Sequence, residues 1–404
     1  MSDIPSELFL HILLQVPAES LLRFRAVCRA WRCIIDDPSF IKSHTTNQVS
    51  SNTLLIRNLS GARLFSLSLD SINYAEGCQT IEVTPVKRVI RRGVPYFCDL
   101  PVASCNGLIL ISHYDVKKTW VIWNPLTREF RELPEPDTEV RLRGSGIGYD
   151  YAADDYKVVR IDEQIRHGEF VNQTFVYSLK SDSWRMIKDC PYYIWPLGQG
   201  VYLNGALHWR SSNMIIVLDL ETEDYTQLPL PPVPIRPRAP LEQCLDAMDG
   251  CLFLSCYYMI ERLDGWMMKD YGVEKSWMKL FSFGKLDIIN SLGHLRPIAY
   301  LKSKGQVLLQ HDTRFFWLDI EKNSAKKVTI DGLPDNFSSQ NFQGSLVRLN
   351  DSGGVGRSVA MKITGAKRKR ANTRLKLRVK ITDWSDSDSI YDSDSSWWSY
   401  DSDW

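Results

Sequence analysis

A short turn followed directly by an apolar strand recurs along the middle of the chain, and this repeat limits the possible folds more than any other feature. Such turns stand at Asn106-Gly107, Asn204-Gly205, Asp249-Gly250 and Lys304-Gly305, with Asp154-Asp155 between the first two and Ser51-Asn52 as a candidate first copy. The copies are about 45 to 55 residues apart. Most of them contain a second hairpin, and these begin at Trp123, Tyr177, Leu218 and Trp317.

Two hairpins in a step of this length are typical of the four-stranded blade of a β-propeller. About six steps fit between residues 50 and 350. We therefore predict an all-β propeller of six blades over this range. An irregular pair of β-sandwiches is the alternative that the same strands would allow.

The residues before this repeat have a helical pattern instead. Apolar residues recur at helical spacing from Leu8 to Val16, and Pro17 ends that stretch. Ser20 is suited to cap a second helix, a third helix follows, and Asp36-Asp37-Pro38 is expected to close the unit. Three short helices cannot bury this many apolar residues among themselves. The excess must pack on the rest of the chain or on a partner.

The order of motifs in residues 1–45 is similar to that of an F-box. The matching positions are Ile4-Pro5, Leu8, Ile12-Leu13, Val16-Pro17, residues 20–25, Val27-Cys28-Arg29 and Trp31. Val16, where Leu is common, and Glu19, where a basic residue is common, are mild departures. The resemblance implies a small all-α domain of three short helices that docks onto the Skp-type adaptor protein of cullin ubiquitin ligases.

In that family an apolar stripe of the three helices inserts between helices of the adaptor. Carried over to this sequence, the adaptor-binding residues are Ile4, Pro5, Leu8, Ile12, Leu13, Val16, Pro17, Leu21, Leu22, Val27 and Trp31. For any single one, such as Leu13 or Val27, the alternative is a place in the protein's own core. Because such an interface is essentially hydrophobic, we expect the arginines at positions 23, 25, 29 and 32 to form a solvated rim.

Residues 105–280 resemble the F-box-associated (type 1 interaction) domain of plant F-box proteins. The matching segments are 105–108, 123–127, 148–150, 155–158, 183–185, 202–209, 266–272 and 276–280. Asp264-Gly265 departs slightly from the usual acidic-aliphatic pair. The resemblance implies that the propeller receives a protein substrate and has no chemistry of its own. The matching residues look structural, so we expect the tryptophans at positions 123, 184, 209 and 277 in the core of the blades.

Loops between blades are better candidates for substrate binding, because connections carry recognition while the scaffold fixes them. One candidate is the Pro-rich segment 228–240, which contains Arg236 and Arg238. The other is the aromatic cluster of Tyr192, Tyr193 and Trp195, a composition typical of binding hot spots. For each segment the alternative is a packed linker.

Neither catalysis nor metal binding is indicated by the sequence. The seven histidines form no H-E-x-x-H or H-x-H pattern, the nine cysteines form no C-x-x-C pair, and no G-x-S-x-G elbow occurs. Segment 144–148 resembles part of a Gly-rich phosphate loop, but neither Lys-Ser/Thr nor a helical pattern follows it. We expect a non-catalytic protein without a metal or cofactor. A propeller enzyme with catalytic groups in the central channel is the alternative.

Residues 351–404 depart from the family pattern, because they are first basic and then acidic. Lys367, Arg368, Lys369 and Arg370 form a cluster of nuclear-import type, with a solvated linker as the alternative. Residues 374–381 alternate cations with apolar residues, and an Asp/Ser/aromatic run follows. We expect a disordered charged tail. Three roles stay open: a strand added to a partner's sheet edge, pairing of the acidic run with the basic stretch, or a solubilising tail.

Charge and hydropathy limit the partners and the compartment. Lys and Arg number 49 and Asp and Glu 48, so the net charge of +1 does not favour nucleic acid as a partner. No apolar run reaches the roughly 18 residues of a membrane helix, and the first residues lack the basic region of a signal peptide. We therefore expect a protein of the cytoplasm, the nucleus or both, without a membrane partner.

Together these patterns predict the substrate-recognition subunit of a Skp-cullin-F-box ubiquitin ligase. The F-box would bind the adaptor, and through it the cullin, while the propeller holds an unknown protein substrate. A scaffold that binds the adaptor without marking its partner is the alternative.

Overall fold

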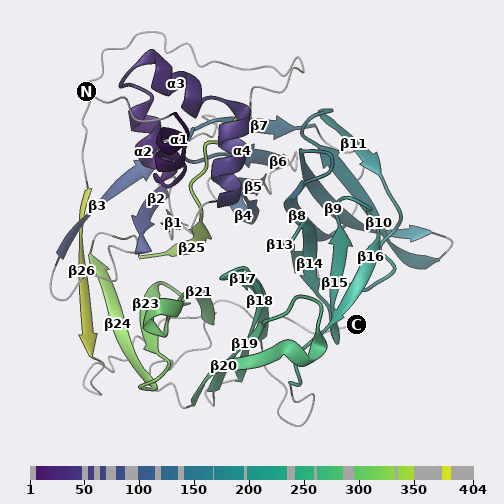
Figure 1. The fold of residues 1–404 in the computed structure, drawn as a ribbon. Coiled ribbons are helices and arrows are strands. Elements are labelled where there is room, and N and C mark those ends of the chain that lie inside the picture. Colours follow the sequence, from purple (N-terminus) through teal and green to yellow (C-terminus); the bar gives the residue numbers. More distant parts are fainter. Residues whose placement is uncertain are drawn as a thin grey trace.

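The computed structural model describes residues 6–47, 53–58, 64–69, 79–86, 99–113, 120–134, 141–166, 168–194, 198–233, 242–258, 262–284, 295–331, 333, 335–349 and 375–383. Within these residues, four helices lie at one edge of a ring of β-sheets (Figure 1). The helices are α1 (Ser6–Leu14), α2 (Ala18–Phe24), α3 (Arg29–Ile35) and α4 (Pro38–Asn47). Two single-turn 3₁₀ helices, η1 (Glu274–Ser276) and η2 (Lys302–Lys304), lie between strands of the ring.

The helical unit therefore has four helices, where the sequence pattern predicted three. Asp37 caps α4, because its carboxylate accepts hydrogen bonds from the backbone N–H groups of Ser39 (2.9 Å) and Phe40 (3.1 Å). The hydroxyl of Ser39 donates to the same carboxylate, and these bonds lower the pKa of Asp37. Pro38 occupies the first helical position, where its missing N–H is not needed. The segment expected to close the unit thus opens its last helix.

The strands form five hydrogen-bonded sheets. In spatial order, four of the sheets contain β4 (Asp99–Cys105), β5 (Leu108–His113), β6 (Trp120–Trp123) and β7 (Phe130–Leu133); β12 (Gly198–Gln199), β8 (Arg141–Asp150), β9 (Asp155–Arg166), β10 (Glu169–Ser178) and β11 (Ser183–Met186); β13 (Val201–Leu203), β14 (Ala206–Arg210), β15 (Met214–Asp219) and β16 (Tyr225–Pro229); and β17 (Glu242–Met248), β18 (Cys251–Tyr258), β19 (Arg262–Met268) and β20 (Trp277–Gly284). The fifth contains β21 (Leu295–Leu301), β22 (Gln306–His311), β23 (Arg314–Asp319), β24 (Ser324–Asp331), β26 (Leu375–Asp383), β3 (Gln79–Val86), β2 (Leu64–Ser68), β1 (Thr53–Asn58) and β25 (Phe337–Phe342).

The propeller is present, but the prediction of six blades is wrong, because the described strands form five sheets. The fifth sheet has nine strands, because β26 pairs antiparallel with β24 on one side and with β3 on the other. It thereby joins two four-stranded sets, β21–β24 and β25-β1-β2-β3, into one sheet. The expected disorder of the tail is corrected for residues 375–383, whose alternating sequence suits a strand.

The ring is closed by strands from opposite ends of the propeller. β25 pairs antiparallel with β1 over its whole length, with Leu54 opposite Asn341 and Ile56 opposite Ser339. Leu54 and Ile56 are fully buried. In Figure 1, β4, β13, β17, β21 and β25 lie nearest the centre of the ring. Neighbouring sheets pack through apolar side chains, as Leu110 of β5 and Val158 of β9 do.

The recurrent turns explain the period seen in the sequence. Asn106 and Gly107 both have positive φ angles (47° and 75°), and so do the corresponding Asn-Gly and Asp-Gly pairs at 204–205 and 249–250. Two positive φ angles define the type I′ turn, whose twist matches that of a β-hairpin. Each turn therefore joins an inner strand to the next strand of its sheet.

Residues 344–349, here named the latch, follow β25 and lie against the second hairpin of the β4–β7 sheet. Asn124, at the end of β6, is fully buried, and its Nδ2 donates to the carbonyl oxygens of Ser345 (3.0 Å) and Val347 (2.7 Å). Its Oδ1 accepts from the backbone N–H groups of Leu126 (2.9 Å) and Thr127 (3.2 Å). One side chain thus shapes its own turn and holds the latch.

The latch also attaches the helical unit to the propeller. Leu346 is buried in the core of the helical unit, together with Leu13, Leu21, Ile35 and Phe40. The next residue of α4, Ile41, packs against both this core and the propeller core. Lys42 forms an ion pair with Asp154 (2.8 Å), but both side chains are half exposed, so this pair contributes little. The attachment is mainly apolar.

Gly107 tests the contact between the first turn and the latch. A Cβ atom on Gly107 would lie 2.2 Å from the Cβ of Ser345 and 2.6 Å from the carbonyl oxygen of Gln343. We expect Gly107→Ala to lower the free energy of unfolding by about 3 kcal/mol, as the sum of backbone strain and overpacking. Gly250→Ala is the matched control: it has a similar φ (72°) but nothing within 4 Å of the added atom. It should cost about 1 kcal/mol. Equal shifts of the thermal midpoint in the two variants would contradict the role of the latch contact.

His208 lies buried between two sheets. Its Nδ1 is 3.0 Å from the carbonyl oxygen of Val201, and its Nε2 is 2.6 Å from the hydroxyl of Tyr271, which follows β19. Burial lowers the pKa of His208 from 6.5 to about 4, and the hydrogen bond to Val201 only partly opposes this effect. The imidazole is therefore neutral in the folded protein near neutral pH.

This lowered pKa predicts a pH dependence of stability. The unfolded chain takes up a proton at His208 below pH 6.5, whereas the folded chain does so only near pH 4. The contribution of His208 is therefore complete above pH 6.5 and falls as the pH decreases. Between pH 6.5 and 5 we expect a loss of about 2 kcal/mol, measured by urea unfolding with tryptophan fluorescence. His208→Asn should flatten this slope, whereas His11→Asn, at an exposed position of α1, should keep it.

Candidate functional site

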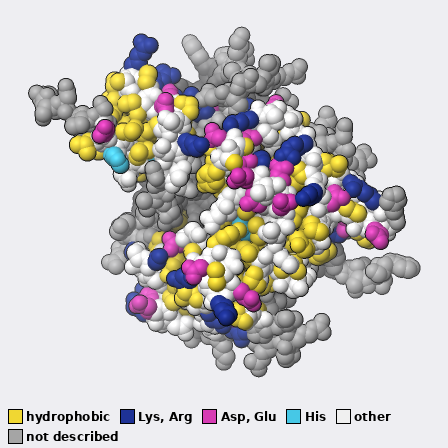
Figure 2. All heavy atoms as spheres, turned by 45° about the vertical axis from the view of Figure 1, so that its right-hand side comes forward, with side chains coloured by type: hydrophobic (Ala, Val, Ile, Leu, Met, Phe, Trp, Pro, Cys, Tyr) yellow, Lys and Arg dark blue, Asp and Glu magenta, His cyan; other side chains and the backbone are white. Residues whose placement is uncertain are grey.

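Helix α1 is apolar over most of its surface, with the exposed Glu7 and His11 on the remaining side, and only part of its apolar surface packs on the protein. Leu13 is buried and Phe9 half buried in the core of the helical unit. Leu8 and Ile12, one helical turn apart, are 57% and 54% exposed, and Val27, between α2 and α3, is 62% exposed. We name Leu8, Ile12 and Val27 the docking residues. Figure 2 shows hydrophobic side chains gathered on the helical unit, at the upper left of that view.

The structure separates the predicted adaptor-binding residues into three groups. Leu8, Ile12, Pro17 and Val27 are exposed, whereas Val16, Leu22 and Trp31 are half buried. Leu13 and Leu21 are 1% and 0% exposed and lie in the core of the helical unit with Phe40 and Leu346, which favours for them the alternative of a place in the protein's own core. Ile4 and Pro5 lie outside the described residues. Leu10, which the family pattern does not single out, is exposed on another side of α1.

Charged and polar groups fix the helices around this surface. Arg25 is half buried and forms an ion pair with Asp36 (2.7 Å), whereas Arg23, Arg29 and Arg32 are exposed, as expected for a solvated rim. His44 of α4 is buried, with its Nε2 2.8 Å from the carbonyl oxygen of Val16. Burial lowers the pKa of His44. Helix α4 is thereby tied to the end of α1.

The loop residues predicted to bind the substrate are only partly described. Tyr192 is half buried against the propeller core, and its carbonyl oxygen accepts a hydrogen bond from Asn172 (2.8 Å). Tyr193 is 51% exposed, with the guanidinium of Arg143 over its ring at 5.6 Å. Trp195, Arg236 and Arg238 lie outside the described residues, as do Lys367, Arg368, Lys369 and Arg370 of the import-type cluster. Within the described part, Tyr193 alone of this loop cluster is available for contact.

The residues shared with the F-box-associated pattern have structural roles. Trp123, Trp209 and Trp277 are buried, which confirms their prediction as core, and Trp184 is half buried. Lys157 is buried, and its Nζ forms ion pairs with Asp150 (2.7 Å) and Glu223 (2.9 Å). Burial alone would lower the pKa of Lys157, but the hydrogen bonds to these two carboxylates raise it. These positions hold the sheets together.

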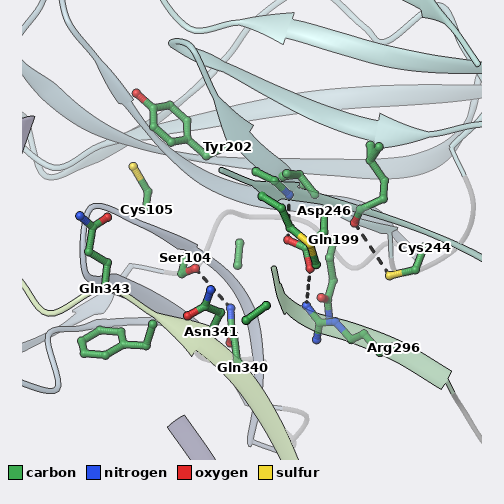
Figure 3. Close-up of a pocket in the computed structure, with 18 of the residues that line it drawn as sticks. Ser104, Cys105, Gln199, Tyr202, Cys244, Asp246, Arg296, Gln340, Asn341 and Gln343 are labelled. Carbon is green, nitrogen blue, oxygen red and sulfur yellow. Dashed lines mark hydrogen bonds and ion pairs between the residues drawn. The ribbon is translucent and has the colours of Figure 1, made fainter. Parts of the chain in front are cut away.

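A cavity of about 540 Å³ lies at the centre of the ring, a volume typical of ligand pockets. Its walls come from β4, β12, β13, β14, β17, β21 and β25 and from the turns that follow some of them (Figure 3). Ser104, Gln199, Gln340 and Asn341 extend polar groups from several of these strands. The sequence reasoning missed these residues, because single polar residues on inner strands form no motif.

At least three of the four charged side chains that line the cavity form ion pairs with nearby residues of opposite charge. Arg296 forms an ion pair with Asp246 at 3.1 Å. Burial would lower the pKa of Arg296, but the carboxylate of Asp246 outweighs it, and the pKa is raised. Asp249 is 3.3 Å from the ammonium group of Lys302. Burial lowers the pKa of the fourth charged group, Arg210.

The described residues give no sign of a metal centre. No group of three or more His, Cys, Asp or Glu side chains among them is placed to hold a metal ion. Burial raises the pKa of the Cys105 thiol, which lines the cavity, so this thiol is protonated at neutral pH. None of the described helices is long and apolar enough to cross a bilayer.

A helical module with an unpartnered apolar side, attached to a propeller with a polar central cavity, defines a protein built for recognition. Residues 1–43 match the F-box domain family, and residues 90–345 match the family described as F-box associated beta propeller domain. The chain belongs to the plant F-box proteins that carry this associated domain.

Three Arabidopsis thaliana proteins illustrate the relationship. The chain is 32% identical to F-box protein CPR1 over 381 residues, which cover 86% of this chain and 89% of that protein. It is 28% identical to F-box protein At4g22390, with 86% and 90% of the two chains covered. It is 30% identical to F-box/kelch-repeat protein At3g23880, with 72% and 82% covered.

Proposed function

We propose that this chain is the substrate-recognition subunit of a Skp-cullin-F-box ubiquitin ligase. The helical unit binds the Skp-type adaptor, which connects it to the cullin, and the propeller holds a protein substrate. The chain itself supplies no catalytic group, because a separate conjugating enzyme carries the ubiquitin. The observation that carries this proposal is the apolar outer side of α1, exposed although its inner side is packed.

The energetics of the docking residues fit a hydrophobic interface. Burying one Leu or Ile side chain contributes about 1.5 to 3 kcal/mol, and Leu8, Ile12 and Val27 are each more than half exposed in this chain. Leu8 and Ile12 lie one helical turn apart, so they present one continuous apolar surface that a partner can cover. The exposed arginines at positions 23, 29 and 32 surround an interface of this kind and aid encounter more than affinity.

The mechanism is proximity. The helical unit is fixed to the propeller by Leu346 of the latch and by Ile41 of α4. A substrate on the propeller is therefore held at a defined distance from the adaptor, and its effective concentration near the conjugating enzyme is raised. Both attachments are apolar, and because Leu346 is buried and Ile41 half buried, the helical unit is held in a fixed position on the propeller.

The adaptor interaction is tested by Leu8→Asp combined with Ile12→Asp. We expect this double variant to lose adaptor binding at least 100-fold, about 3 kcal/mol, because two carboxylates would have to be buried in an apolar interface. Binding is measured by surface plasmon resonance with purified adaptor. The thermal midpoint should stay within a few degrees of the wild type, because both side chains are exposed.

A matched control comes from the propeller. Ile165 and Phe170, opposite each other on β9 and β10, are 70% and 73% exposed. Replacing both with Asp adds the same charge to another exposed apolar pair and should leave adaptor binding unchanged. Failure of the folded wild type to bind the adaptor, or equal loss in both double variants, would refute the proposed interface.

The ligase role is distinguished from a non-degradative scaffold by the fate of bound proteins. Proteins that co-purify with both the wild type and the Leu8→Asp/Ile12→Asp variant are identified, and their half-lives are measured in cells that contain either form. We expect at least one half-life to become twofold longer or more with the variant, because its transfer to the ligase is lost. Unchanged half-lives for all of them would favour the scaffold. Deleting the F-box is less suitable, since it would expose Leu346.

A further inference from the structure

The wall of the central cavity is unusually rich in amide side chains. Six of the lining residues carry one: Asn106, Gln199, Gln243, Gln340, Asn341 and Gln343. They come from the β4–β5 turn, β12, β17, β25 and the residue after β25, so they surround the cavity (Figure 3). An amide both donates and accepts hydrogen bonds without carrying charge. The wall therefore matches an uncharged ligand that carries both hydrogen-bond donors and hydrogen-bond acceptors.

The charges of the wall support the same conclusion. Two arginines and two aspartates line the cavity, so their formal charges cancel. Asp246 and Arg296 already pair with each other at 3.1 Å, and Asp249 pairs with Lys302 outside the lining at 3.3 Å. A charged group that pairs with Asp246, Asp249 or Arg296 would have to displace one of these partners. A neutral ligand leaves both ion pairs in place.

Two of the amides retain acceptors that the described protein does not satisfy. Gln340 donates through Nε2 to the hydroxyl of Ser104 (3.3 Å), while its Oε1 is buried without a hydrogen-bond partner among the described residues. Oε1 of Gln243 is also buried without a hydrogen-bond partner among the described residues. The same holds for Nε of Arg296, which is a donor. The last side-chain torsion of glutamine is soft, so a small rotation can turn each oxygen to the cavity. A ligand with N–H groups would recover these missing bonds.

We propose that the central cavity binds an uncharged, polar segment of the protein substrate. The inference rests on the proposed function, because it takes the ligand of the propeller to be a protein. Each residue of an extended peptide offers one backbone N–H and one C=O, and these are the groups that amide side chains pair with. Gln243 and Gln340 accept from the backbone N–H groups of this segment, and its side chains are those of Ser, Thr, Asn or Gln.

The test uses the full chain and a phage-displayed library of random octapeptides as the probe. Peptides enriched on the wild type are synthesised with a fluorescein label, and their binding is measured by fluorescence anisotropy. We expect the enriched sequences to be rich in Ser, Thr, Asn and Gln and poor in charged residues. Gln243→Met combined with Gln340→Met should weaken their binding at least tenfold, because methionine keeps the length of the side chain but its thioether is only a weak hydrogen-bond acceptor.

Gln227→Met is the matched control, because Gln227 is an exposed glutamine on the outer strand β16, away from the cavity lining. It should bind the peptides within twofold of the wild type. The thermal midpoint of each variant shows whether the fold is kept. No enrichment, enrichment of charged peptides, or equal binding by the folded double variant would each overturn the inference.

Adaptor binding, measured on the same preparations, separates this inference from the proposed function. Loss of peptide binding with adaptor binding intact would remove only the cavity assignment. Peptide binding by a wild type that does not bind the adaptor would instead remove the ligase role and leave the cavity as a peptide site.

Discussion

The pairing of β25 with β1 is the contact on which the rest of the structure depends. It joins strands from the two ends of the propeller, and it carries the chain directly from the wall of the cavity into the latch. Without this pairing the ring is open, and Asn124 has no carbonyl oxygens to hold at Ser345 and Val347. Leu346 would then be missing from the core of the helical unit. One antiparallel strand pair thus supports the ring, the cavity and the attachment of the docking module.

Much of this fold could be predicted from local sequence, because its turns depend on residues that tolerate positive φ angles. Asn106-Gly107 and its counterparts mark each inner hairpin, and their spacing indicates a propeller. The number of separate sheets could not be predicted from the spacing of these turns. It depends on β26, whose pairing with β24 and β3 is a long-range event that no local pattern specifies. The fourth helix was missed for a local reason, since Asp37-Pro38 can end one helix or begin the next.

Which residues of α1 are exposed could not be predicted from the sequence, for a different reason. Because α1 is apolar everywhere except on the side of Glu7 and His11, periodicity cannot decide whether Leu8 and Ile12 or Leu13 face inward. Leu346, more than 300 residues along the chain, decides it by packing against the side that carries Leu13. The cavity was hidden for a similar reason. The recurrent family residues, such as Trp209 and Lys157, are buried between sheets, whereas the cavity is lined by scattered amides whose neighbours in space are distant in sequence.

The latch also couples the two surfaces on which recognition depends. Gln343 lines the cavity, Ser345 is bonded to Asn124, and Leu346 lies in the core of the helical unit. Only two residues separate Gln343 of the cavity wall from Leu346 in the core of the helical unit, and the turn at Gly107 packs against this segment without room for an added Cβ atom. A segment this short and this closely packed has little freedom to move. The position of a ligand in the cavity relative to α1 is therefore set by the fold itself, as a proximity mechanism requires.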